Sequence, residues 1–409
     1  MSLSTEWLLI ILCGLIILSY LFSIASQHIR IPSVLLLLFT GLCFRLVGDA
    51  YDFHPTLPPN LVESLGVVGL IMIVLEAGMD LKLERSKIPL IRNSFLTALV
   101  ILVVSTAVIA AILYFWLKEN LTSCIVYALP LSIMSSSIVL PSIHALSPDK
   151  KEFLVYEASF SDILGLLLFN YFAAKEILTL KSVGIFGFGL VIAVVASLVI
   201  SYILFLVLVR TKMTVKFFLV FALLILIYTG GKMLHLPSLL IILVFGMMVN
   251  NWELVPLKWA RRPFPLEQLE PIRHLLHSIT AESSFLIRTF FFILFGYSID
   301  PTLLVHQEVI LVGSGIVLAL FGVRWAYLRF AFKTKKVFPE VFFIPRGLIT
   351  IVLFYKIPGY LKLSTFNDGI LFFVILSTGL ILAGGMMFYK RPSDEVIEDP
   401  QFSERNDIL

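Results

Sequence analysis

Two acidic residues stand five positions apart in one apolar stretch of this sequence, Glu157 and Asp162. On a helix Glu157 and Ser161 share a face, and Asp162 lies about 100° further round, toward a different neighbour. No Lys or Arg stands one helical turn from Asp162. A carboxylate in such a place can bind a cation when ionised and a proton when neutral, because desolvation brings the neutral form within reach. That competition is the minimal chemistry of cation:proton exchange, whereas the alternative is a structural aspartate held by hydrogen bonds or an ion pair.

Arg324 lies in the middle of a different apolar stretch, where a charged side chain needs a partner. We expect Glu157 to supply the counter-ion, since a buried pair of this kind fixes helix packing without carrying a substrate. This assignment leaves Asp162 as the unpaired carboxylate, and therefore as the candidate ligand for a cation.

Three further charged residues stand at the ends or in the interior of apolar stretches. Glu76 lies near the end of one stretch, where it would line the entrance to a site or pair with Arg346. Arg288 begins another stretch, and its side chain can reach the membrane interface or complement Asp162. The residues themselves leave both pairs of alternatives open.

The composition indicates that these charges are embedded in a membrane. Of the 409 residues 59% are hydrophobic and 14% charged, and the mean hydropathy is +0.99. A soluble domain carries about a quarter charged residues, so most of this surface must face a lipid bilayer. The net charge of +4 does not indicate a nucleic-acid partner. Three cysteines within apolar stretches indicate neither a disulfide framework nor a zinc site, and we expect no cofactor.

Stretches of about 20 apolar residues cross a bilayer as helices, and the sequence contains about thirteen of them. They lie near 6–27, 31–48, 61–80, 88–117, 122–146, 152–174, 182–209, 214–234, 236–251, 282–299, 308–331, 338–359 and 366–389. With this arrangement most of the 31 Lys and Arg residues fall on the side of the C-terminal tail, as the positive-inside rule requires. We therefore predict an all-α polytopic membrane protein of a prokaryotic inner (cell) membrane, with its N-terminus outside and its C-terminus cytoplasmic. The longest loop, about 252–281, is expected to be an interfacial amphipathic segment.

The single predicted domain, 1–409, divides into two six-helix halves around a linking helix at about 182–209. The first half covers about 6–174 and the second about 214–389, and the odd span between them makes the repeat an inverted one. A short cytoplasmic tail, 390–409, follows.

The fifth span of each half is interrupted by proline and by small or polar residues. The first carries Ser135, Ser136 and Ser137 ahead of Pro141, and the second carries the run Pro345 to Gly347. Proline removes a helical hydrogen bond, and small hydroxyl groups can satisfy the backbone groups that it frees. Interrupted helices at matching positions of two halves are the best sequence pointer to a transporter's substrate site, although ordinary proline kinks are the alternative.

The run Glu157 to Asp162 resembles the Glu-x-x-x-Asn-Asp motif on the sixth span of the sodium/proton exchangers, with serine in place of asparagine. The chain is thus similar, over nearly its whole length, to the monovalent cation:proton antiporter superfamily and most of all to that branch. The resemblance implies that Asp162 carries the ion and the proton and that Arg324 is the salt-bridge partner of Glu157. It also places Arg346 in the family's arginine-glycine motif at the broken twelfth span.

One element departs from the exchanger pattern. The exchangers carry threonine-aspartate-proline in the broken fifth span, whereas the serine run of this chain is closer to the glutathione-gated potassium efflux branch. The alternatives to Na⁺/H⁺ exchange are therefore a K⁺ efflux antiporter and a sodium-coupled solute transporter of the same fold. An intramembrane enzyme is not expected, because the sequence has no His-Glu-x-x-His motif and no second mid-span aspartate.

The expected mechanism is antiport by alternating access. Na⁺, or Li⁺ or K⁺ in its place, would bind Asp162, hydroxyls of Ser161 and the run Ser135 to Ser137, backbone carbonyls and water, an oxygen-rich shell that suits a hard cation. With one unpaired carboxylate, one proton replaces one cation and the exchange is electroneutral. The superfamily resemblance also implies a homodimer.

Overall fold

The computed structural model describes residues 5–29, 31–51, 61–143, 146–173, 195–206, 217–233, 238–252, 266–331 and 337–389. Within these ranges the backbone is helical or irregular and contains no strand. Continuous helices satisfy every backbone polar group inside the chain, as lipid demands. The predicted all-α fold is therefore confirmed, while the predicted tail 390–409 and most of the linking helix 182–209 lie outside the described residues.

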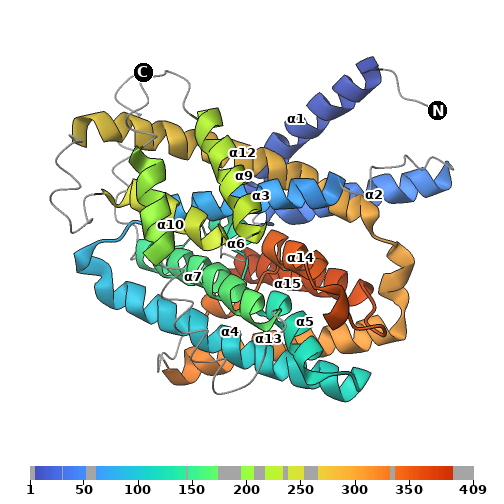
Figure 1. Ribbon diagram of the computed structural model, residues 1–409. Helices are drawn as coiled ribbons and strands as arrows, with labels where there is room; N and C mark the ends of the chain where they lie inside the picture. The colour runs from blue at the N-terminus through green and yellow to red at the C-terminus, as the bar shows by residue number, and fades with distance from the viewer. Residues whose placement is uncertain are drawn as a thin grey trace.

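The helices follow the chain from the blue to the red end of Figure 1. In chain order they are α1 (Thr5–Ile29), α2 (Ser33–Ala50), α3 (Leu61–Asp80), α4 (Ile88–Leu117), α5 (Leu121–Ser132), α6 (Ser136–Ser142), α7 (Pro148–Phe172), α9 (Phe217–Met233), α10 (Ser238–Asn250), α12 (Leu266–Ser298), α13 (Gln307–Ala331), α14 (Leu348–Tyr355) and α15 (Gly369–Phe388). Short 3₁₀ turns are η1 (Arg85–Lys87), η3 (Pro301–Val305), η4 (Glu340–Phe342) and η5 (Gly359–Leu361).

These helices reproduce the predicted spans in order. Among the described residues, six helices are long and apolar enough to cross a membrane by length and composition alone. One of these six is α5 and α6 taken together, as the single interrupted span Leu121–Ser142. The segment of η4 and α14 forms the second interrupted span, and residues 195–206 are helical within the predicted linking helix.

The structure differs from the prediction at α12. The sequence predicted a span at 282–299 preceded by a separate interfacial segment at 252–281, but one helix, α12, runs through both from Leu266. Hydropathy marks the part of a helix that lies in lipid, and it does not detect a helix that continues beyond the lipid boundary.

The helices form two packed groups (Figure 1). In the first, which we call the scaffold group, α2 and α3 pack on α12, α3 also packs on α10, and α1 and α9 lie against this set. In the second, the core group, α4 packs on α5, α7 and α13, while α15 lies on α13, α14 on α5 and α6 on α7. Contacts between α3 and α14 join the two groups.

Two helix crossings of the scaffold group bring backbones into direct contact at glycine. Gly41 of α2 meets Gly296 of α12, and Gly78 of α3 meets Gly246 of α10. A Cβ atom on Gly78 would lie 2.6 Å from a backbone oxygen of α10, so a larger residue would push the helices apart. In the numbering of the predicted spans, α2 and α12 are the second and tenth, and α3 and α10 are the third and ninth. The crossing of α2 with α12 therefore corresponds to the crossing of α10 with α3, as an inverted repeat would require.

Candidate functional site

The two interrupted spans cross each other inside the core group. Residues 133–135 between α5 and α6 are not helical, and neither are residues 343–347 ahead of α14. The backbone N–H of Ser135 donates to the carbonyl oxygen of Pro345 at 3.0 Å. A Cβ atom on Gly347 would overlap the side chain of Ser135, so glycine permits this close approach. The sequence predicted both interruptions, and the structure places them in contact.

Arg346 holds this crossing together from a buried position. Its Nε donates to the carbonyl oxygen of Leu131 at 2.5 Å, and its Nη1 donates to that of Ile344 at 2.9 Å. Leu131 lies in the last turn of α5, where carbonyl groups lack helical partners and carry partial negative charge. The guanidinium therefore neutralises a helix end, and it bonds to carbonyl groups where the sequence had suggested Glu76 as one possible partner.

Asp162 lies on α7 beside the crossing, and its side chain is only 5% exposed. Its Oδ2 accepts a hydrogen bond from the Ser136 hydroxyl at 2.5 Å, while its Oδ1 is buried and has no hydrogen-bond partner among the residues that the structure describes. The Ser159 hydroxyl, one turn earlier on α7, is likewise buried and finds no partner within the described ranges. A buried carboxylate oxygen left in this state is costly, so the Asp162 carboxylate is suited to take up a cation or a proton.

Glu157 and Arg324 form a buried bidentate ion pair between α7 and α13. Arg324 Nη1 donates to Glu157 Oε1 at 2.6 Å and Nη2 donates to Oε2 at 3.0 Å. Arg324 Nε donates in addition to the carbonyl oxygen of Glu340 at 2.6 Å. Two parallel bonds fix the relative position of the two helices.

Ser161 faces this ion pair and not the Asp162 carboxylate. Its hydroxyl accepts a hydrogen bond from the backbone N–H of Met134 at 2.9 Å, and the side chain lines a polar pocket of about 10 Å³ with Ser132 and Arg346. The sequence had grouped Ser161 with the cation ligands. In the structure its bond fixes the interruption between α5 and α6.

A larger cavity of about 470 Å³ lies between the scaffold and core groups. Its walls include Glu76 of α3, Arg288 of α12, and Ser137 and Pro141 of α6. Arg288 Nη2 lies 3.4 Å from Glu76 Oε1, so these two residues pair with each other. Of the residues that the sequence proposed for the broken helices and the entrance, Pro141, Glu76 and Arg288 thus share one cavity, whereas Arg346 lines the small polar pocket. Ser137 also shares a hydrogen bond of 2.9 Å with Ser135, the serine at the crossing.

Sequence reasoning missed two residues of this cavity region. Asp80 lines the cavity, and its Oδ1 lies 2.8 Å from Nε2 of His277 on α12. The available signal was spacing, because Asp80 follows Glu76 by one helical turn and so shares its face. His277 gave no signal, since the loop prediction removed it from the membrane helices.

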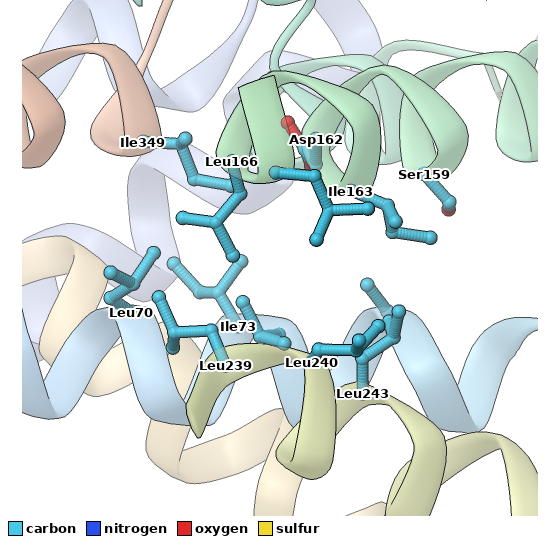
Figure 2. Close-up of a pocket in the computed structure, with 13 residues that line it drawn as sticks. Leu70, Ile73, Ser159, Asp162, Ile163, Leu166, Leu239, Leu240, Leu243 and Ile349 are labelled. Atoms are coloured by element: carbon cyan, nitrogen blue, oxygen red, sulfur yellow. The ribbon is translucent and has the colours of Figure 1, made fainter. Parts of the chain in front are cut away.

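Asp162 also lines an apolar pocket of about 20 Å³, which lies between α7 and the helices α3 and α10. Figure 2 shows Asp162 at the α7 edge of this pocket, with its carboxylate turned away from the leucine and isoleucine side chains of α3 and α10. Those side chains are Leu70, Ile73, Leu239, Leu240 and Leu243. Toward this side Asp162 therefore meets hydrocarbon, while the polar cavity lies along α6.

Among the described residues, no three His, Cys, Asp or Glu side chains gather as a metal site. Among the described residues, the oxygen donors that we find beside Asp162 are its own carboxylate and serine hydroxyls. Such a low-charge oxygen set is suited to a monovalent cation, whereas multi-carboxylate cages bind Ca²⁺.

Two interrupted helices that cross beside a buried, unpaired carboxylate define a class of secondary transporters that bind their substrate inside the membrane. The family model described as sodium/hydrogen exchanger, transmembrane, matches residues 14–388, and the chain belongs to this family. The predicted resemblance to the sodium/proton exchanger branch is therefore confirmed, and the chain is an integral membrane transporter.

The fold is similar to that of two structures of the sodium proton antiporter MjNhaP1 from Methanocaldococcus jannaschii. The structure at pH 8 shares 16% identity, with 94% of each chain covered and a TM-score of 0.65. An electron-microscopy structure shares 18% identity over 95% of this chain and 100% of that chain, with a TM-score of 0.63. At these identities the comparison shows a common fold. No curated protein matches the chain.

Proposed function

We propose that this protein exchanges Na⁺ for H⁺ across a membrane and that Asp162 is the group for which the two ions compete. The observation that carries the proposal is the state of its carboxylate, which is buried, accepts a hydrogen bond from Ser136 on one oxygen and has no partner among the described residues on the other. Family membership supports the exchange reaction, and this geometry supports Asp162 as the group at which it takes place.

The ligand set that the geometry favours is narrower than the one that the sequence suggested. Ser136 is already bonded to Asp162, so its hydroxyl oxygen is placed to contact a cation held by the carboxylate. The hydroxyls of Ser135 and Ser137 bond each other, and Ser161 is bonded to the backbone. We assign Na⁺ to Asp162, Ser136, carbonyl groups of residues 133–135 and water, with the other three serines holding the interruption in shape.

Access to Asp162 alternates between the two sides of the membrane. The cavity lined by Glu76 and Asp80 reaches the core group from one side, and the apolar side chains in Figure 2 seal the opposite side. Movement of the core group against the scaffold group would close the open side and open the sealed side. We place the cavity on the cytoplasmic side of a prokaryotic inner membrane, with the N-terminus outside, and propose that the unit is a homodimer.

The stoichiometry follows from the partners of the carboxylates. Glu157 is paired with Arg324 and Glu76 with Arg288, so Asp162 is the unpaired carboxylate in the part of the interior that the structure describes. One proton then replaces one monovalent cation, and no net charge crosses the membrane.

The test is a pH-dye assay on liposomes containing wild type, Asp162→Asn or a matched control, Asp49→Asn. Asp49 is exposed at the end of α2, where Arg45 is its partner. Addition of Na⁺ is expected to move protons with wild type and with Asp49→Asn but not with Asp162→Asn. A response to K⁺ alone would assign the chain to K⁺ efflux, and an unchanged response from Asp162→Asn would remove Asp162 from the mechanism.

A further inference from the structure

Residues 81–87 join α3 of the scaffold group to α4 of the core group. The segment begins with a fully buried Leu81, continues without helical structure to Glu84, and ends in the 3₁₀ turn η1. Because it is covalently attached to both groups, a displacement of one group against the other must be taken up within it.

Asn251, directly after α10, holds the beginning of this linker on the scaffold group. Its Oδ1 accepts a hydrogen bond from the backbone N–H of Leu83 at 2.5 Å, and its Nδ2 donates to the carbonyl oxygen of Leu81 at 2.6 Å. The same Nδ2 donates to the carbonyl oxygen of Met247 in α10 at 2.8 Å. The side chain is 8% exposed and has used both its donors and its acceptor. Linker residues 81–83 are therefore part of the scaffold group.

Tyr156 reaches the same linker from the core group. Its hydroxyl donates to the carbonyl oxygen of Lys82, the residue between the two that Asn251 holds. Tyr156 is buried, its ring stacks on Phe160, and it lies on α7 less than two turns before Asp162. The helix that carries the substrate carboxylate is thus hydrogen-bonded to a segment that is fixed to the scaffold.

We propose that Asn251 and Tyr156 make residues 81–83 a latch that stabilises the state with the polar cavity open. The two Asn251 bonds stay with the scaffold throughout, while the single Tyr156 bond is made in this state and broken when α7 moves. This inference rests on the proposed alternating access and extends it by naming a positioning residue. Loss of one buried hydrogen bond changes an equilibrium roughly threefold to tenfold, which sets the size of the effect.

The proposal is tested by alkylation rates in lipid nanodiscs, where both faces of the protein meet the reagent. In a background without Cys13, Cys43 and Cys124, one reporter cysteine replaces Leu140 in the polar cavity and, separately, another replaces Leu166 in the apolar pocket. The probe is a charged maleimide. Its reaction rate at each reporter measures the fraction of time for which that side is open.

Tyr156→Phe is expected to slow alkylation at position 140, by at most the roughly threefold to tenfold change in the equilibrium, and to speed it at position 166. In proteoliposomes the apparent KM for Na⁺ added on the cavity side should rise by the same factor, because the competent fraction falls, while the maximal rate is kept. Tyr114→Phe, an exposed tyrosine at the far end of α4, is the matched control and should change neither rate. Unchanged rates at both reporters in a folded, transporting Tyr156→Phe protein would overturn the proposal.

Asn251→Asp provides a second test that does not depend on the stability of the tyrosine variant. It keeps the acceptor for Leu83 but loses the donated bonds to Leu81 and Met247, so the linker is held less firmly and the rates should shift in the same direction. Unchanged rates would show that Asn251 does not hold the linker. If wild type exchanged no cation yet Tyr156→Phe still shifted the alkylation rates, the latch would stand and the proposed function would fail.

Discussion

Among the described residues, one side-chain hydroxyl, that of Ser136, donates a hydrogen bond to the buried Asp162 carboxylate. In the proposed site, the 2.5 Å hydrogen bond from Ser136 Oγ would favour the ionised carboxylate and so favour binding of a cation. The serine run in the sequence pointed to this place, but it could not say which of three adjacent serines would face the carboxylate. That choice depends on how α6 begins after the interruption, which is a tertiary feature.

Ser136→Ala is expected to weaken Na⁺ binding about tenfold to a hundredfold, because a hydrogen bond to a charged group contributes about 1.5–3 kcal/mol. The apparent KM for Na⁺ in the proteoliposome assay measures this change. Ser105→Ala is the control, since that buried hydroxyl of α4 has no hydrogen-bond partner among the described residues. An equal KM for both variants would exclude Ser136 from the site.

Glu157→Gln is expected to lower the stability of the protein more than it changes cation affinity. Breaking one partner of a buried pair leaves the Arg324 charge uncompensated, which costs about 3–5 kcal/mol. Thermal unfolding in detergent and Na⁺ titration on the same sample separate the two effects. Glu308→Gln, which alters an exposed acceptor on α13, serves as the control. Normal melting with altered affinity would place Glu157 in the ion site.

At the scale of elements, the interruptions of the fifth and twelfth spans were visible in the sequence as proline beside small residues. Their hydrogen bond through Ser135 and Pro345 was not visible, because local sequence does not determine which helices cross. The carbonyl partners of Arg346 were hidden for the same reason: they exist only once the end of α5 lies beside the second interruption. Hydropathy did not detect the N-terminal extension of α12 because the first turns of this helix are polar.

Gly347→Ala is expected to reduce transport strongly, because the added methyl group overlaps Ser135 at the crossing. Removing the opposing side chain should relieve the overlap, so the double variant Ser135→Gly with Gly347→Ala should recover part of the rate. Gly322→Ala in α13 is the control, since a Cβ atom there meets no other atom within 4 Å. Initial rates of Na⁺-driven proton movement report the result. A double variant as inactive as the single one would contradict the steric explanation.

At the scale of the whole molecule, hydropathy and the distribution of Lys and Arg predicted the number and order of spans. The division into scaffold and core groups could not be predicted, because nearly every helix is apolar on all sides and its sequence does not mark the face that meets protein. The glycines at the helix crossings are the residues that mark a buried face, and they can be recognised only when their partners, such as Gly78 and Gly246, are known.

The proposed electroneutral exchange concerns the whole molecule and is expected to leave transport independent of voltage. In liposomes with equal Na⁺ concentration and pH on both sides, a potential set by a K⁺ gradient and valinomycin should drive no net Na⁺ movement if one proton balances one cation. Flux of ²²Na⁺ at several imposed potentials is the measurement. A flux that grows with potential would require a second transported charge, and the paired Glu76 would be the first residue to examine.

The backbone contacts at Gly41 with Gly296 and at Gly78 with Gly246 have a thermal consequence. Helices that touch through their backbones have few side-chain rotamers between them to become disordered on warming. We therefore expect the scaffold group to keep its shape as temperature rises, with side-chain motion concentrated where leucine and isoleucine side chains separate it from the core group. The activation enthalpy of ion exchange should accordingly reflect disordering of the leucine and isoleucine side chains between the two groups, and not a change in the helix packing of the scaffold group.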